Sequence, residues 1–157
     1  MVNRTSLPQL EGGLFLGIAG IETTLVFHNG IDLPEFAAFV ALADPQGEAA
    51  IRKCYRQYGA VAKKHGTGLI LDSATWRANP DWGKKLGYSS NKLAEANRQA
   101  ISLLEDIRSE FESAATRVVI SGCLGTRGDG YNPSKKMSVP ESESYHREQI
   151  GVFEATA

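Results

Sequence analysis

The segment that most constrains the fold is an apolar run followed at once by a glycine-rich loop, RVVISGCLGTRGDGY over residues 117–131. The run 118–120 consists of β-branched residues without polar alternation, which is typical of a strand buried on both faces in a parallel sheet. Four glycines follow between positions 122 and 130, where they allow sharp turns and a close approach of the backbone. Ligands of α/β proteins bind beyond the carboxyl ends of the strands, so we expect a site at this junction.

Two earlier segments have the same order of apolar run, polar loop and amphipathic helix. The apolar runs at 14–19 and 69–71 predict two further strands. Apolar residues recurring every three or four positions predict one helix from Asp44-Pro45 to a stop at Gly66, and a second from Ser89-Ser90 to Phe111.

The third helix is predicted to begin at Ser138, because Ser138-Val139-Pro140-Glu141 fits a capping box, and to run through Phe153. A short apolar helix at 35–42 is expected to cover one end of the core. The segment 77–88 is expected to be a long loop with about one helical turn.

Three consecutive βα units predict an α/β fold with parallel strands joined by right-handed helical crossovers, in a single domain over residues 1–157. A complete (β/α)8 barrel needs about 250 residues, so this chain corresponds to a partial barrel.

The composition is that of an ordinary soluble domain, with 42% hydrophobic and 22% charged residues and a net charge of -1. The mixed charges give no electrostatic reason to expect binding to nucleic acid or to an anionic membrane. Cys54 and Cys123 are far apart and in no CxxC spacing. We therefore expect a reduced, cytoplasmic protein without a disulfide framework.

The loops after the three expected strands, residues 19–24, 72–76 and 122–131, should face the same edge of a parallel sheet, which we call the rim. Polar, aromatic and sulfur side chains in these loops are the candidates for binding or chemistry. They are Glu22, Thr23, Asp72, Thr75, Trp76, Cys123, Arg127 and Asp129.

Each candidate has a structural alternative. Glu22 is either a polar pocket group or an acid favoured by the dipole in the first turn of a helix. Asp72 leaves a buried strand and must find a donor or a ligand, or else it ties down the next loop. Trp76 and Trp82 either line an apolar pocket or serve in packing. Cys123 is either a thiolate or a small residue that closes the strand.

The sequence offers no evident catalyst beside these residues. His65 and His146 fall in expected helices, and His28 stands isolated in an expected loop. No His, Cys or acidic residues have a recognisable metal-ligand spacing, so no metal site is predicted. The glycine loop, with G-x-x-G-x-x-G from position 122, only superficially resembles a phosphate-binding loop. Within it, Arg127 and Asp129 are expected to pair with each other.

Three stretches together resemble bacterial members of the homocysteine S-methyltransferase family: GIETTLVFHNGIDLPEFAAF (20–39), ATWRANPDWGKKLGY (74–88) and VVISGCLGTRGDGY (118–131). The resemblance extends over essentially the whole chain but only over the first part of the family domain. It implies the first three βα units of a TIM-type (β/α)8 barrel, which agrees with the independent count of expected strands.

The resemblance also implies an activity, the transfer of a methyl group to the thiol of homocysteine to give methionine, with a zinc ion that lowers the thiol pKa. The family's zinc ligands are three cysteines in later parts of the barrel, and neither cysteine of this chain matches them. The family's Asp-Gly-Gly at the first strand is here Ile18-Ala19-Gly20. The positions carried over to the rim are Glu22, Thr23, Thr75, Trp76, Cys123 and Gly125, with Thr126 in place of a common proline.

These observations lead to three expectations. The first is a fragment or truncated product of such a methyltransferase, inactive alone, whose partners in a completed barrel would be a small-molecule thiol and a methyl donor. The donor could be a methylated thioether, a betaine or a folate. The second is a binding or self-associating module that pairs through the exposed edges of its first and third strands. The third is an anion binder that uses the loop 122–130.

Overall fold

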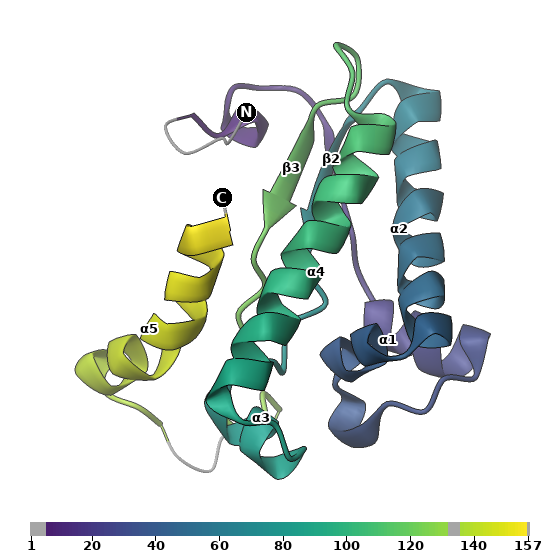
Figure 1. The fold of residues 1–157 in the computed structure, drawn as a ribbon. Helices are drawn as coiled ribbons and strands as arrows, with labels where there is room; N and C mark the ends of the chain where they lie inside the picture. Colours follow the sequence, from purple (N-terminus) through teal and green to yellow (C-terminus); the bar gives the residue numbers. More distant parts are fainter. Residues whose placement is uncertain (1–5, 132–135, 157) are drawn as a thin grey trace.

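The computed structural model describes residues 6–131 and 136–156, and its centre is a three-stranded parallel sheet (Figure 1). The strands are β1 (Phe15–Gly17), β2 (Gly68–Asp72) and β3 (Val118–Ser121), in the order β1-β2-β3. The predicted parallel α/β arrangement is confirmed, and the sheet is open, with β1 and β3 at its edges.

The helices follow the strands in the predicted alternation. Besides the α-helices, there are 3-10 turns at Pro8–Leu10, Pro34–Phe36 and Ala38–Ala43 and a π-helical turn at Thr24–His28. The α-helices are α1 (Ile21–Thr23), α2 (Pro45–His65), α3 (Pro80–Lys85), α4 (Ser90–Phe111) and α5 (Val139–Thr156).

Both ends of α2 have the structure that the sequence indicates. The side chain of Asp44 accepts a hydrogen bond from the backbone N–H of Gly47 at 2.8 Å, with Pro45 in the first turn. Gly66 ends the helix in the left-handed conformation, with φ of 61°. Local capping therefore determines where this helix begins and ends.

The start of α5 also follows its sequence signal. A carboxylate oxygen of Glu141 accepts hydrogen bonds from the backbone N–H and the hydroxyl of Ser138, each at 2.8 Å. The glutamate half of the predicted capping box is thus present.

The helix predicted over 35–42 is present as two 3-10 turns and not as one continuous helix. The chain forms two 3-10 turns, separated at Ala37 by extended backbone, and both Glu35 and Phe36 have φ of 55°. The second turn buries Ala38, Phe39, Ala41 and Leu42, so nearly every residue faces the core rather than one in three or four. Tertiary burial of this small apolar run favours tight turns over an amphipathic α-helix.

Two smaller differences concern loops. The expected helical turn within 77–88 is α3, which begins at Pro80 because the side chain of Asn79 accepts a hydrogen bond from the N–H of Trp82 at 3.4 Å. His28 was expected in a loop, but it ends the π-helical turn that continues α1.

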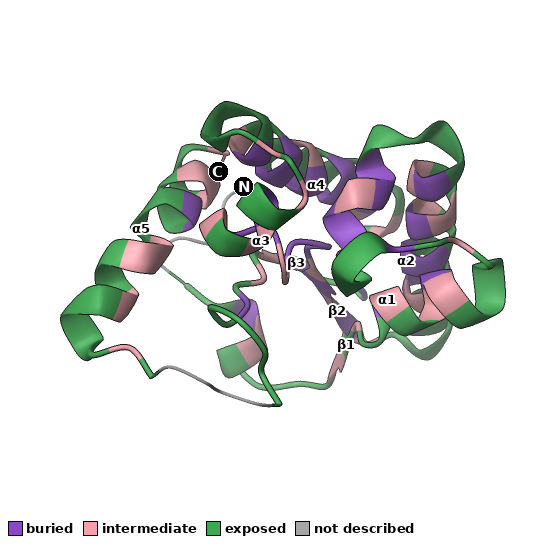
Figure 2. Ribbon diagram, turned by 90° about the horizontal axis from the view of Figure 1, so that it is seen from below, coloured by how far each residue is buried: buried purple, intermediate pink, exposed green. Residues whose placement is uncertain are grey.

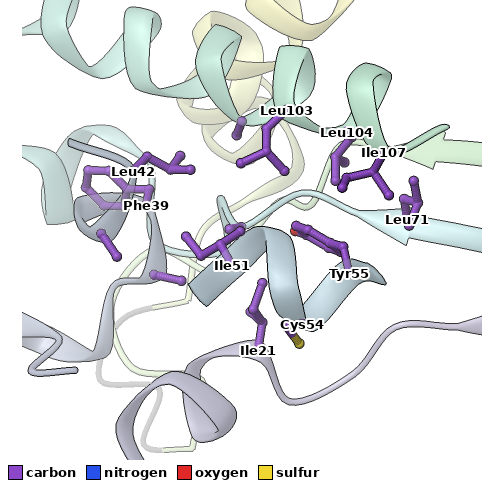
Figure 3. Packing of buried hydrophobic residues seen from close by; sticks show 14 of the residues in the cluster. Ile21, Phe39, Leu42, Ile51, Cys54, Tyr55, Leu71, Leu103, Leu104 and Ile107 are labelled. Atoms are coloured by element: carbon purple, nitrogen blue, oxygen red, sulfur yellow. The ribbon is translucent and has the colours of Figure 1, made fainter. Parts of the chain in front are cut away.

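The hydrophobic core lies between the sheet and the pair of helices α2 and α4. Leu71 of β2 is fully buried and packs in one cluster with Ile51 and Tyr55 of α2 and Leu104 and Ile107 of α4 (Figure 3). Because parallel partners such as Leu71 and Ile120 share a face of the sheet, this face forms one continuous apolar surface.

The three long helices follow one side of the sheet. Figure 2 shows α2, α4 and α5 in an arc beside the strands, and α4 contacts both of its neighbours. No helix in the part of the chain that the structure describes is long and apolar enough to cross a membrane. The arrangement brings the segments after β1, β2 and β3 to one edge.

Candidate functional site

Hydrogen bonds join the loops that follow β2 and β3. The hydroxyl of Thr75 donates to the carbonyl oxygen of Cys123 at 2.8 Å, and the N–H of Cys123 donates to the hydroxyl of Ser73 at 2.9 Å. The two hydroxyls lie 2.6 Å apart. Thr75 is fully buried, so its hydroxyl fixes the rim backbone, and Ser73 is a rim residue that the sequence analysis missed.

Gly125 allows the same two loops to touch. A Cβ atom at this position would lie 1.8 Å from the carbonyl oxygen of Trp76 and 2.7 Å from its indole Cδ1. No side chain fits there, since real contacts of this kind are never so short. The glycine is therefore required by the close approach of Trp76, not by an unusual φ angle.

A chain of buried amides supports the rim from behind. Gln149 of α5 donates from Nε2 to the carbonyl oxygen of Thr75 at 3.2 Å and to Oδ1 of Asn97 at 2.9 Å. Asn97 of α4 donates in turn to the carbonyl oxygens of Ala78, at 3.1 Å, and Leu93. These amides connect two helices to the loop after β2.

Asn79 makes the corresponding connection to the loop after β3. Its side chain donates to the carbonyl oxygen of Thr126 at 3.2 Å and accepts from the hydroxyl of Tyr145 at 2.7 Å. None of the three buried amides Asn79, Asn97 and Gln149 was predicted from the sequence. The first two had a signal: Asn79 precedes a proline as an N-cap does, and Asn97 interrupts an apolar helical face, where a buried amide needs partners.

Two acids and a thiol lie close enough at the rim to influence one another. Burial, together with the charges of Asp72 and Glu22, raises the pKa of Cys123 to about 11. Burial also raises the pKa of Glu22, against the opposing effect of the Arg77 charge. At neutral pH the thiol of Cys123 is protonated, which favours the closing residue over the thiolate among the two alternatives.

The backbone of Asp72 is held by the core. The phenol of Tyr55, which is buried beneath the rim, donates to the carbonyl oxygen of Asp72 at 2.7 Å. The side chain of Asp72 is half-buried. Glu22 is half-buried too and lies in the first turn of α1, as the helix-start alternative expects.

An aromatic cluster adjoins this edge. The guanidinium of Arg77 lies 4.8 Å from the ring centroid of Trp76 and 4.0 Å from that of Trp82. Its Nη1 also donates to the carbonyl oxygen of Glu35. The side chain of Glu35 forms an ion pair with Lys85 at 2.7 Å. This set of contacts ties the segment before α2 to α3.

Two candidates lie away from the cluster of acids and thiol. Thr23 is exposed on α1. Arg127 forms its ion pair with Asp81 of α3, at 2.7 Å, and lies 5.1 Å from the ring of Tyr145. The expected pairing within the loop is wrong, because Asp81 is brought beside Arg127 by the fold, while Asp129 accepts from the N–H of Tyr131 at 2.8 Å.

The zinc ion that the family resemblance implies does not fit the side chains found here. Among residues 6–131 and 136–156, no three His, Cys, Asp or Glu side chains are grouped closely enough to hold a metal ion. Cys54 is buried in the core and Cys123 is a protonated thiol among acids. No step of a reaction is therefore assigned to a metal bound by these residues.

Parallel βα units with polar loops gathered at the carboxyl edge of the strands are the arrangement of part of a (β/α) barrel. The family model described as homocysteine S-methyltransferase matches residues 19–157, and the chain belongs to this family. No curated protein matches the chain.

Two solved structures of the homocysteine methyltransferase MmuM from Escherichia coli have the same fold. The metallated form matches with a TM-score of 0.69 and 18% identity, covering 95% of this chain and 53% of the other. The oxidized form matches with a TM-score of 0.67 and 16% identity, covering 92% and 50%. The chain thus spans about half the length of these relatives.

Proposed function

We propose that this chain supplies three βα units and part of the substrate-binding rim of an enzyme that transfers a methyl group to the thiol of homocysteine. The observation that carries the proposal is the family match over residues 19–157. The rim supports it, because the candidate residues Glu22, Asp72, Trp76 and Cys123 lie at one edge of the sheet. Its partners are then a small-molecule thiol and a methyl donor.

In this proposal the two acids supply the charge that attracts an amino-acid substrate. Glu22 and Asp72 follow β1 and β2, and carboxylates there complement the ammonium group of homocysteine. Ile18 stands where relatives have an acid, so these two carboxylates take over that role. Trp76 provides an apolar wall. Cys123, held protonated, does not compete with the substrate sulfur for the methyl group.

We further propose that the chain of 157 residues transfers no methyl group alone. The side chains described above offer no three-ligand group for the metal of the family chemistry. Purified chain should form no methionine from homocysteine and a methylated thioether, a betaine or a methylated folate, with zinc present. Zinc-dependent formation of methionine would contradict this statement.

Substrate binding can be tested independently of turnover. We expect homocysteine to bind weakly, and Asp72→Asn to weaken binding several-fold, since one charge-assisted contact contributes about 1 kcal/mol or more. Asp106→Asn, a change on the exposed outer side of α4, is the matched control. Calorimetric titration that shows no binding, or equal binding by both variants, would contradict the role of the rim.

The open sheet supports a second candidate, a module that associates with itself. β1 and β3 each have one edge without a neighbouring strand in the described sheet, and such edges favour further pairing. Leu14, which directly precedes β1, is 73% exposed. Sedimentation or size-exclusion measurements should show dimers or larger species at micromolar concentration, and a stable monomer would exclude this candidate.

The proposed cellular context is the cytoplasm. Both cysteines are free, as expected in a reducing compartment. Neither nucleic acid nor membrane is proposed as a partner, since the net charge is -1 and charges of both signs are mixed along the chain.

A further inference from the structure

The aromatic cluster beside the rim already contains a cation. Trp76 and Trp82 are the two tryptophans of the chain, and the Arg77 guanidinium lies over both rings, 4.8 and 4.0 Å from their centroids. Its Nη1 donates to the carbonyl oxygen of Glu35, and its Nε is buried without a hydrogen-bond partner. Within residues 6–131 and 136–156, no carboxylate lies at ion-pair distance from Arg77.

This environment differs from that of other arginines on the molecule. Arg56 makes two-pronged contact with the carboxylate of Glu110, and Arg127 pairs with Asp81. Arg77 instead contacts the faces of two indole rings and donates a hydrogen bond to a carbonyl oxygen. Since the negative face of an indole attracts cations, the tryptophan pair gathers positive groups. The Arg77 guanidinium lies over both rings, and the Lys85 ammonium lies 5.1 Å from the ring centroid of Trp82.

The position over the two tryptophan rings that Arg77 occupies adjoins the rim. Trp76 is the last residue of the loop after β2, and its carbonyl and indole face Gly125 of the loop after β3. The charge of Arg77 also reaches Glu22 after β1: burial raises the pKa of that carboxyl, and the Arg77 charge opposes the rise. A ligand at the ends of all three strands therefore meets the edge of this cluster.

Methylated sulfonium and quaternary ammonium groups bind proteins through the same aromatic faces. A cationic ligand at this cluster would have to displace Arg77 or lie beside it, and adjacent like charges repel. We propose that Arg77 is a specificity-determining residue that occupies the Trp76–Trp82 pair and excludes methyl donors with a cationic head group.

The substrate class that follows rests on the function proposed above: an uncharged methyl donor. With a tertiary amine as donor, the bond from methyl carbon to nitrogen breaks, and its electron pair stays on nitrogen. The methyl carbon forms a bond to the homocysteine sulfur, and the proton lost by the thiol ends on the donor nitrogen. Atoms and charge balance without a further reactant.

Tetramethylammonium is a suitable probe because intrinsic tryptophan fluorescence reports on this cluster alone. The unchanged chain should show little saturable change, whereas Arg77→Ala should bind the ion about tenfold more tightly, in line with a desolvated cation–π contact. Arg77→Lys keeps a cation and should behave like the unchanged chain. Arg56→Ala removes an arginine from an exposed ion pair between α2 and α4 and controls for net charge.

Two outcomes would overturn the proposal: binding of tetramethylammonium by the unchanged chain as tightly as by Arg77→Ala, or no gain in a folded Arg77→Ala. Circular dichroism verifies folding, and Arg77→Met, which keeps an unbranched apolar stem without the charge, replaces Arg77→Ala if that variant unfolds. The same gain should vanish in Arg77→Met with Trp82→Ala. Because no methyl transfer is measured, failure of the proposed enzyme function and failure of this inference are distinguishable.

Discussion

The two sides of α4 pack against the rest of the molecule in different ways. Toward α2 and the sheet, α4 presents the fully buried apolar side chains of Leu104 and Ile107. Toward α5, the contact includes the hydrogen bond from Gln149 to Asn97 at 2.9 Å, and Gln149 is the buried residue of α5. Apolar burial is non-directional and supplies stability, whereas the buried amides are directional and fix the position of a loop.

The apolar side of α4 stabilises the fold, whereas the amide side positions the rim. The core between α2, α4 and the sheet includes residues from both long helices and from β2. The amides of α4 and α5 instead bond to the backbone of Thr75 and Ala78, next to Trp76 and Arg77. Substitutions on the apolar side of α4 should therefore lower the global free energy of unfolding. Substitutions of the buried amides should affect the rim loops before the rest of the fold.

The largest loss of stability is expected from Leu104→Ala, on the apolar side of α4. Truncation of a fully buried leucine removes transfer free energy and leaves a cavity, which costs about 2–5 kcal/mol. Urea unfolding followed by circular dichroism measures the change. Val61→Ala, on an exposed position of α2, should change stability by less than about 0.5 kcal/mol. A smaller loss for Leu104→Ala than for variants in the amide network would reverse the comparison.

The second-largest loss of stability is expected from Gly125→Ala, because its new Cβ would lie 1.8 Å from the backbone carbonyl of Trp76. A backbone atom cannot move aside as a flexible side chain does, so we expect a loss of about 1–3 kcal/mol. The tryptophan emission should shift as the loops separate. Gly151→Ala is the matched control, since a Cβ there meets open space and alanine favours helix. An unchanged emission spectrum in Gly125→Ala would show that the contact is dispensable.

Gln149→Ala tests the amide side directly. The change leaves the carbonyl of Thr75 and Oδ1 of Asn97 without this donor, at a cost of about 1–2 kcal/mol. Hydrogen exchange should accelerate in α5 and in residues 73–79, with much less change in α2. Ser144→Ala, an exposed position of α5, is the control. Uniformly faster exchange in all helices would mean that α5 belongs to the same cooperative unit as the core.

The sequence predicted the features that depend on local signals. The strands, the ends of α2 at Asp44 and Gly66, and the start of α5 at Ser138 all follow from residues a few positions apart. The 3-10 turns between Pro34 and Ala43 were not predicted, because they depend on burial by distant elements. Local propensity does not contain that information.

In the candidate site, too, the features set by local sequence were predicted and those set by long-range contacts were not. Segments at the carboxyl ends of strands can be recognised from alternation alone, and Glu22, Asp72, Trp76 and Cys123 lie where this predicted. The ion pair of Arg127 with Asp81 joins residues 46 positions apart, and Gln149 reaches back 52 positions to Asn97. No spacing rule connects such pairs, so Arg127 was assigned to the neighbouring Asp129.

The smallest effect, and the finest test of the rim, concerns the pH dependence of Cys123. Burial together with the charges of Asp72 and Glu22 raises its pKa to about 11. The reactive thiolate should therefore be scarce at neutral pH and increase as the pH rises toward that value. Alkylation rates in a Cys54→Ala background measure this profile, because Cys54 is itself buried in the core.

Glu22→Gln then separates the contribution of charge from that of burial. Removing a negative charge makes the thiolate easier to form, so the alkylation profile should move to lower pH while burial keeps it above the ordinary thiol value of 9.0. Glu143→Gln, on the exposed face of α5, should leave the profile in place. If both variants react alike, Glu22 does not act on the Cys123 thiol, and burial with the charge of Asp72 accounts for its raised pKa.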